Sequence, residues 1–364
     1  MPESNMDLVA SVILILVKIG VFFALFMLIL AYLTLVERRF LGFFQERYGP
    51  NRVGWQGLLQ PIADGIKMFM KEEVTVTGAN KGVYILAPIV FVAAALMTFS
   101  VIPFGNVIWP ATMEIGGRVY NFTLANANRG VIADVNVAML IVFGISSIGI
   151  YGLIMAGWGS NNKYALLGGV RASAVMISYE LAAGLALIGV VMTTGSMSLM
   201  DIVEFQGGYW FGFIPKWFCF TQPLAFVIFL IAIFAETGRT PFDFTECENE
   251  LVAGYQMEYS SMKFALFYLA EYGHMLAASA LMVTFFLGGW QGPFVNAPVL
   301  KYFLPVIYFC TKTFVLVFFF VWVRATYPRF RYDLLMKLGW KVLLPATLVN
   351  ILISPITMKL FGHL

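Results

Sequence analysis

The stretch LVASVILILVKIGVFFALFMLILAYLTLV, residues 8–36, is apolar at nearly every position and carries a single charge, Lys18. A helix needs about 20 predominantly apolar residues to cross the hydrocarbon core of a bilayer, so this stretch is long enough to span and to tilt. No basic segment precedes it and no small-residue cleavage site follows it, which argues against a cleaved signal peptide. The stretch therefore predicts a transmembrane helix.

Comparable apolar stretches recur along the 364 residues, and the composition agrees with them. The chain is 60% hydrophobic and 12% charged, whereas soluble domains are about 45–50% apolar and about 25% charged. We therefore expect an all-α, polytopic membrane protein, a single integral membrane domain over residues 1–364, with about eight transmembrane helices. The predicted spans are roughly 8–36, 83–104, 131–156, 165–193, 217–236, 262–290, 298–327 and 340–361.

The same composition excludes several other classes of protein. Three scattered cysteines, Cys219, Cys247 and Cys310, are too few for a disulfide scaffold. Two histidines with no Cys/His cluster argue against a metal, haem or iron–sulfur site in this chain. A net charge of +3 gives no reason to expect a nucleic-acid partner.

The loops predict the orientation, because Lys and Arg accumulate on the cytoplasmic side. With the N-terminus outside, the inside loops hold 16 of the 23 Lys and Arg residues, and the outside segments hold five. The remaining two, Lys18 and Lys312, fall within spans. Both termini are therefore predicted on the periplasmic side.

The first inside loop contains an amphipathic helix over residues 58–71. Pro61 suits its first turn, where the missing N–H costs nothing. The segment is too polar to span, so it predicts a helix in the membrane interface or one packed on the rest of the protein. Both hold if the helix covers a cavity that opens toward lipid. Its apolar residues, at helical spacing, are Leu58, Leu59, Ile62, Ile66, Phe69 and Met70.

Several acidic side chains fall inside the predicted spans, where a carboxylate costs about 2.5–3.5 kcal/mol on insertion scales. Asp134 lies early in the third span, Glu180 midway through the fourth, Glu236 at the end of the fifth and Glu271 within the sixth. Lys18 and Lys312 are the only intramembrane cations that could pair with them.

Two interpretations of these acids compete. Burial raises a carboxylate's pKa toward neutrality, so the acids could form a relay of protonatable groups. Alternatively each acid caps a helix end or bonds a neighbour, which is as good an explanation for Asp134 and Glu236 near span ends. The depth of Glu180 and Glu271 favours the relay. His274, three residues after Glu271, is a minor candidate, since a lone histidine is more often a satisfied core residue.

The inside loop over residues 237–261 is acidic on the side where cations normally accumulate. Apolar residues such as Pro241 and Phe242 are interleaved with the acids around a single arginine, Arg239. This mixture indicates a loop packed against a partner protein or a membrane-facing cavity. The acids of the loop and its first boundary are Glu236, Asp243, Glu246, Glu248, Glu250 and Glu258.

Three motifs in this order carry a resemblance to a known family. They are Glu37-Arg-Arg with Gln45-Glu-Arg-Tyr-Gly-Pro-Asn-Arg-Val-Gly54 and Leu59-Gln-Pro-Ile-Ala-Asp64-Gly-Ile-Lys67; Asn161 to Arg171 continuing to Ile177-Ser-Tyr-Glu180; and Arg239-Thr-Pro-Phe-Asp through Gly254 and Glu258-Tyr. Together they resemble the H subunit of bacterial respiratory complex I, the counterpart of mitochondrial subunit 1. The likeness covers nearly the whole chain.

The resemblance implies a membrane subunit of a proton-translocating NADH:quinone oxidoreductase in the bacterial inner membrane. It implies that the chain anchors the electron-transfer arm and forms a quinone chamber with peripheral-arm subunits. The substrate would be a lipid quinone, ubiquinone or menaquinone. NADH, FMN and iron–sulfur clusters would sit on other subunits, and antiporter-like membrane subunits would be further partners. No complete active site, and no catalytic residue, is then expected in this chain alone.

The resemblance also implies roles for particular residues. The amphipathic helix, with the first and sixth spans, would frame a lipid-facing quinone portal. Residues of this portal and chamber would be Arg38, Arg39, Arg47, Arg52, Asp64 and Phe242. Residues that relay protons or couple quinone reduction to their movement would be Asp134, Glu180, Glu236, Asp243, Glu246, Glu248, Glu250 and Glu271.

Three alternatives remain open from the residues. The membrane anchor of an energy-converting hydrogenase has a related pattern, although the long loop motifs favour the quinone-linked branch. A proton-coupled secondary transporter should show inverted repeats and broken helices at matching positions, and the sequence has no internal repeat. A purely structural anchor accounts for the acidic loop but not for Glu180 and Glu271.

Overall fold

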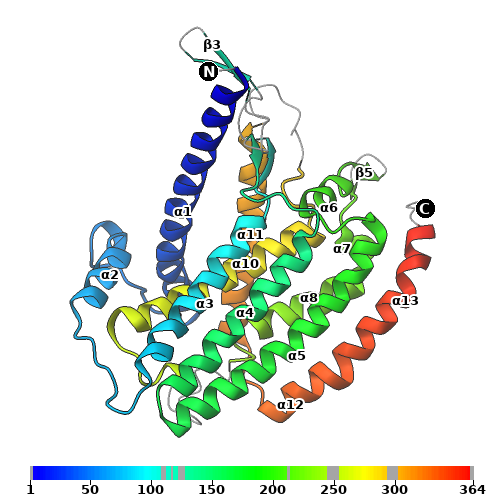
Figure 1. Ribbon diagram of the computed structural model, residues 1–364. Helices are drawn as coiled ribbons and strands as arrows, with labels where there is room; N and C mark the ends of the chain where they lie inside the picture. The colour runs from blue at the N-terminus through cyan, green and yellow to red at the C-terminus, as the bar shows by residue number, and fades with distance from the viewer. Residues whose placement is uncertain are drawn as a thin grey trace.

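The computed structural model describes residues 3–107, 112–115, 118–121, 128–210, 214–243, 254–292 and 302–360. Helices dominate these residues, and seven of the helices described are long and apolar enough to cross a membrane. The prediction of an all-α membrane protein is thereby confirmed. Figure 1 shows the helices side by side, with the N-terminal end of α1 at the top, α2 at the left beside the other end of α1, and the C-terminal end of α13 at the right.

The long helices and the amphipathic helix follow one another along the chain. Their bounds are α1 Glu3–Phe44, α2 Gln60–Met70, α3 Lys81–Val101, α4 Ala138–Gly159, α5 Lys163–Thr194, α8 Pro223–Glu236, α10 Ser261–Phe286, α11 Leu304–Thr326 and α13 Leu344–Leu360. Shorter helical elements connect them: η1 Trp55–Gly57, α6 Leu199–Phe205, α7 Phe218–Thr221, η3 Gly254–Gln256, α12 Tyr332–Lys337 and the π-helical turn η5 Leu338–Leu343.

Three two-stranded antiparallel pairs lie in the connections at the end of the molecule opposite α2 (Figure 1). Each is too short to form a domain, and they close the ends of the helices. The pairs are β1 Gly105–Val107 with β4 Arg129–Gly130, β2 Thr112–Ile115 with β3 Arg118–Asn121, and β5 Tyr209–Trp210 with β6 Ile214–Pro215.

Several predicted boundaries were wrong. The third span begins at Ala138 rather than near residue 131, so Asp134 precedes the helix instead of lying inside it. The fifth is broken at Gln222 into α7 and the 14-residue α8, which at 1.5 Å per residue is only about 21 Å long. The last span begins earlier, because α12 continues through the π-helical turn into α13.

The break at Gln222 has a local cause. Its buried amide donates to the carbonyl oxygen of Gly189 at 2.9 Å and to the Thr193 hydroxyl at 2.7 Å, both on α5. Pro223, which lacks an N–H, then occupies the first turn of α8. Hydropathy does not show that Gln222 bonds to α5, so the sequence predicted one continuous span where the structure has two helices.

Small residues let the central helices approach closely. Helix α5 packs against α4, α8 and α13, and its buried face carries Ala172, Ala182, Ala183 and Ala186. A Cβ atom at Gly152 of α4 would lie 3.0 Å from Phe91 of α3. Lipid is as apolar as the helices, so membrane helices associate through van der Waals contact, and small side chains allow the close approach that this contact requires.

The two intramembrane lysines, the candidate partners of the acids, both donate to backbone carbonyls. Lys312 donates to the carbonyl oxygens of Leu287, Gly289 and Gln291 just beyond α10, at 2.7–3.0 Å. Lys18 donates to the carbonyl of Val131 at 2.8 Å. Cations at these positions satisfy carbonyls that a helix end or a turn leaves without partners.

Candidate functional site

Helix α10 divides two polar regions of the molecule. Glu271 and His274 lie on one side of it, against α3, α4 and α8. Tyr268 and Tyr272 lie on another side, against α1 and α2. Residues three or four apart share a helix face, so the spacing of these two pairs explains why each pair points into one region.

The first region joins carboxylates of α5 and α8 through two neighbouring serines of α4. The Ser146 hydroxyl donates to Glu236 of α8 at 2.5 Å, and the Ser147 hydroxyl donates to Glu180 of α5 at 2.7 Å. Glu180 also interacts electrostatically with Glu236. The structure thus brings together two acids that lie 56 positions apart in the sequence.

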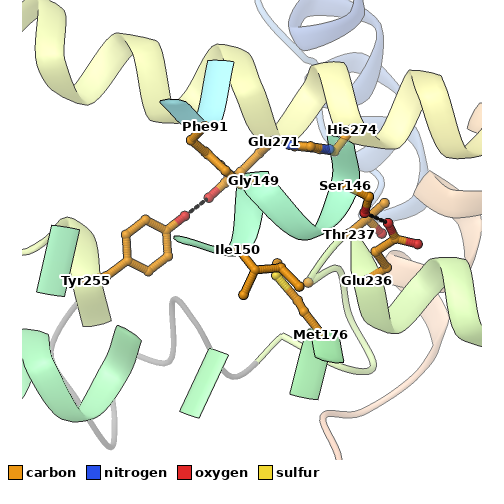
Figure 2. A pocket seen from close by; sticks show the side chains of 11 residues that line it. Phe91, Ser146, Gly149, Ile150, Met176, Glu236, Thr237, Tyr255, Glu271 and His274 are labelled. Atoms are coloured by element: carbon orange, nitrogen blue, oxygen red, sulfur yellow. Dashed lines mark hydrogen bonds between the residues drawn. The ribbon is translucent and has the colours of Figure 1, made fainter. Parts of the chain in front are cut away.

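Glu271 joins this region from the other side. It accepts hydrogen bonds from the Tyr255 hydroxyl at 2.7 Å and the Gln256 amide at 2.5 Å, both in η3. Figure 2 shows Tyr255 pointing at Glu271 across the site, with Ser146 and Glu236 on the far side. A buried carboxylate needs such donors, because an unpaired charge in a low dielectric is costly.

Two small cavities connect these groups. The first, about 20 Å³, is lined by Ser146, Glu236, Tyr255, Glu271 and His274 among others (Figure 2). The second, also about 20 Å³, touches Ser146, Glu236 and His274 as well. A cavity of roughly 10–15 Å³ or more with polar walls is large enough for one water molecule. Water in these cavities would link Glu271 to Glu236, so the arrangement is chemically able to pass protons.

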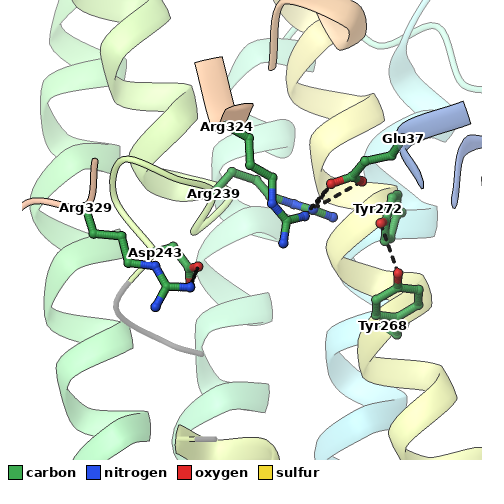
Figure 3. A network of polar contacts seen from close by, with 7 residues as sticks. All are labelled: Glu37, Arg239, Asp243, Tyr268, Tyr272, Arg324 and Arg329. Atoms are coloured by element: carbon green, nitrogen blue, oxygen red, sulfur yellow. Dashed lines mark hydrogen bonds and ion pairs between the residues drawn. The ribbon is translucent and has the colours of Figure 1, made fainter. Parts of the chain in front are cut away.

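The second region is an ion cluster around Glu37, near the C-terminal end of α1 (Figure 3). Arg239 donates to its carboxylate at 3.1 and 3.3 Å, and Arg324, near the end of α11, pairs with it as well. Glu37 is 3% exposed. The cluster therefore ties the loop after α8 to both α1 and α11.

Tyr272 of α10 completes this cluster. Its side chain lies close enough to Glu37 to interact with the carboxylate, and the Arg239 guanidinium lies 4.4 Å from its ring centroid. Burial lowers the pKa of Arg239, but the charge of Glu37 and contacts with Tyr272 and Glu271 raise it well above its ordinary value. Arg239 is thus a permanent cation, and Glu271 lies within its electrostatic reach.

A cavity of about 250 Å³ lies beside this cluster, between α1, α2 and α10. Tyr268 and Tyr272, whose hydroxyls are 3.0 Å apart, form part of its wall. The ion pair of Arg38 with Asp64, at 2.7 Å, lies at the same cavity. The predicted amphipathic helix is therefore present as α2, and it covers a cavity formed with the first and sixth predicted spans.

The predicted portal residues do not all gather there. Arg38 and Asp64 line the cavity; Arg39 does not, and Arg47 and Arg52 are exposed in the loop between α1 and α2. Phe242 is buried instead, with its ring 5.7 Å from Tyr179 and 5.8 Å from Phe330.

The predicted relay residues separate in a similar way. Glu180, Glu236 and Glu271 come together, whereas Asp134 lies before α4 and pairs with Arg129 at 2.6 Å. Asp243 is buried and pairs with Arg329 at 3.0 Å, beside the Glu37 cluster (Figure 3). Glu246, Glu248 and Glu250 lie outside the residues that the structure describes.

Several residues of the two regions were missed from the sequence. Glu37 follows an apolar run and was assigned to the loop, yet α1 continues through it to Phe44. Ser146 and Ser147 are paired hydroxyls in the middle of an apolar span, a signal that could have marked them as partners for the acids. Tyr272 and Arg324 carried no signal, because their roles depend on packing between distant segments.

Comparisons with known proteins agree with this architecture. The family profile described as NADH dehydrogenase matches residues 17–355. The H 1 subunit of NADH-quinone oxidoreductase from Geobacter sulfurreducens is 48% identical over 94% of this chain and 94% of its own length. The H 2 subunit from Geobacter metallireducens is 47% identical over 96% and 97%. The H subunit from Rhodospirillum rubrum is 48% identical over 89% and 88%. The chain therefore belongs to the NADH dehydrogenase family, the family of these H subunits.

Proposed function

We propose that this chain forms the quinone portal of a proton-translocating NADH:quinone oxidoreductase and couples quinone reduction to proton movement. The observation that carries the proposal is the position of α10 between the 250 Å³ cavity and the half-buried carboxylates Glu236 and Glu271. Helix α10 would then contact both the cavity that a quinone enters and the carboxylates whose protonation changes when the quinone is reduced.

The cavity between α1, α2 and α10 has the properties that a portal for a lipid quinone needs. The outer face of α2 exposes Ile62, Ile66 and Met70, which suits a helix lying in the membrane interface. The Arg38–Asp64 ion pair marks the polar end of the cavity. An isoprenoid tail would remain among apolar side chains while the polar head group passes toward the partner subunits.

Coupling would run through Tyr272 and its neighbour Glu271. Tyr272 contacts the cavity, Glu37 and Arg239, whereas Glu271 faces Glu236 across a water-sized cavity. A change of charge near the quinone would alter the field of the Glu37 cluster and hence the proton affinity of Glu271. Interacting carboxylates titrate as a group, so no single proton has to travel the whole line.

The rest of the complex would supply the chemistry that this chain lacks. Peripheral-arm subunits would carry NADH, FMN and iron–sulfur clusters and close the quinone chamber, and antiporter-like subunits would receive the coupling signal. The acidic loop beside Arg239 is the natural contact with them. The excess of cations around α2 supports a bacterial inner-membrane orientation with both termini in the periplasm.

A constriction in the cavity tests the portal. Met68 of α2 is half-buried and lines the cavity, so the variant Met68→Trp should narrow it. We expect the KM for a long-tailed quinone to rise about tenfold, equivalent to about 1.4 kcal/mol of lost binding. NADH–ferricyanide reductase activity, which bypasses the quinone, should not change.

Ile66→Trp is the matched control, since Ile66 lies on the same helix, is 55% exposed and does not line the cavity. An unchanged KM for long-tailed quinone in Met68→Trp, in a complex with normal ferricyanide activity, would contradict the portal. Equal effects in the two variants would instead assign them to the membrane contact of α2.

A further inference from the structure

A larger cavity lies between α1 and α11, away from the two regions described above. The rings of Phe40 on α1 and Phe318 on α11 are 4.9 Å apart, and nearer the N-terminal end of α1, residues of both helices line this cavity. It has a volume of about 530 Å³, and α10 forms its floor. Both helices can be followed in Figure 1. We call this cavity the α1–α11 slot.

The slot is long. Its α1 wall runs from Val17 to Leu33 at helical spacing, a length of about 24 Å at 1.5 Å per residue. An extended hydrocarbon chain lying along this wall would contact apolar side chains over its whole length.

The side chains that line the slot are almost all apolar. Of the described residues that line the slot, Lys18 alone is charged, and its amine is bonded to the carbonyls of Arg129 and Val131. The Thr313 hydroxyl donates to the Phe309 carbonyl of its own helix at 2.9 Å. A quinone head group would need polar partners in a site that recognises it, and these groups are already engaged.

The slot opens sideways to the surroundings of α1. Val17, Val21 and Leu25 on its rim are 53%, 55% and 52% exposed, whereas Phe26 and Ala280 on its floor are buried. These rim residues belong to the predicted first span, so the surroundings are the acyl chains of the bilayer. One leaflet is about 15 Å of hydrocarbon, so the slot, at about 24 Å, is long enough to hold an acyl chain from one leaflet.

We infer that the α1–α11 slot binds one acyl chain of a membrane phospholipid. A bound chain supplies the dispersion contacts that the walls would otherwise lack, and it holds α1 at a fixed distance from α11. Leu30 to Arg38 of the same helix line the cavity assigned to the portal. An acyl chain in the slot thus supports the helix on which that cavity depends.

Photo-crosslinking tests the inference in the intact complex. The purified complex is reconstituted in vesicles of phosphatidylethanolamine and phosphatidylglycerol, doped with phosphatidylethanolamine that carries a diazirine in its acyl chain. After illumination, mass spectrometry of the digest should find lipid adducts on peptides containing Phe26 and Phe309 of the slot. Absence of adducts at both residues would overturn the inference.

Two matched variants and a second probe sharpen the result. Leu25→Trp at the rim should lower the adducts on the Phe26 and Phe309 peptides at least fivefold, whereas Leu28→Trp, on the same helix, 54% exposed and outside the slot, should leave them. Cys310→Trp blocks the slot from α11 if Leu25→Trp fails to assemble. Adducts formed only by a quinone with a diazirine in its isoprenoid tail would overturn the assignment to phospholipid.

Discussion

Glu37 and Glu180 are both glutamates in long membrane helices, but their surroundings differ. Glu37 is paired with two arginines, Arg239 and Arg324. Glu180 accepts from the hydroxyl of Ser147 and lies close enough to Glu236 for the two acids to interact. The first carboxylate is held by fixed positive charge, and the second by a neutral donor near a like charge.

The difference indicates two kinds of task. A carboxylate between two guanidinium groups stays ionised, because arginine does not give up its proton in proteins. Such a cluster positions segments and sets a field. A carboxylate such as Glu180, which accepts from a neutral hydroxyl and lies near another acid, has no such constraint and is able to gain or lose a proton. We therefore propose that the Glu37 cluster positions the segments around it and that Glu180, Glu236 and Glu271 transfer protons.

The largest expected effect comes from breaking the Glu37 cluster. Glu37→Gln leaves the buried Arg239 and the half-buried Arg324 without their carboxylate, which should cost about 3–5 kcal/mol. We expect little assembled complex on a native gel and a lower midpoint of thermal unfolding for what assembles.

Arg38→Gln is the matched control for stability, since it breaks the neighbouring Arg38–Asp64 pair, whose side chains are 42% and 31% exposed. An exposed pair is worth about 0–1 kcal/mol, so assembly should persist. Normal assembly and an unchanged unfolding midpoint in Glu37→Gln would contradict the positioning role of Glu37, and with it the proposed difference between Glu37 and Glu180.

The next effect concerns proton transfer itself. Glu180→Gln keeps the shape of the side chain and removes the protonatable group. We expect quinone reductase activity and proton pumping to fall at least tenfold, or about 1.4 kcal/mol in the barrier, with assembly and NADH–ferricyanide activity intact. Glu204→Gln in α6, where the side chain is exposed, is the control. Normal pumping in Glu180→Gln would sink the relay role of Glu180.

The contrast also explains what the sequence could predict. The spans were predictable because hydropathy reports burial in the bilayer directly, and α3 (Lys81–Val101) lies close to the predicted 83–104. Glu180 and Glu271 stood out because a carboxylate in a span is expensive. Their partners did not, since the contact of Ser147 with Glu180 depends on how α4 packs on α5.

For Glu37, the sequence prediction missed the residue itself and not only its partners. A charged residue at the end of an apolar run is normally the start of a loop, and the sequence was interpreted in that way. The helix continues because Arg239 and Arg324, from segments more than 200 positions away, neutralise the carboxylate. No pattern in the sequence around Glu37 predicts its contacts with these two arginines.

A smaller effect should follow from removing the hydroxyls. Ser147→Ala deletes one donor to Glu180, and a hydrogen bond of this kind contributes about 1 kcal/mol. We expect the pumping rate to fall about fivefold. Ser146→Ala should act similarly through Glu236. Ser279→Ala in α10 is the matched control, because its buried hydroxyl bonds only the Met275 carbonyl of its own helix among the described contacts.

Pumping in the Ser147→Ala variant should be measured in vesicles against quinone reductase activity in the same preparation. An equal loss in Ser279→Ala would show that the effect is one of packing. An unchanged rate in both Ser146→Ala and Ser147→Ala would contradict the link between these serines and proton transfer.

The smallest effect is expected at Asp134, where the sequence placed an acid of the relay. The structure puts this residue before α4, paired with a half-exposed Arg129 and apart from the cavities that join Glu236 and Glu271. Asp134→Asn should therefore change the pumping rate less than twofold, since a partly exposed ion pair contributes about 0–1 kcal/mol. A loss as large as that in Glu180→Gln would mean that the proton path from Glu180, Glu236 and Glu271 runs past Asp134. Asp134, which precedes the N-terminal end of α4, would then have to be counted among the residues that transfer protons.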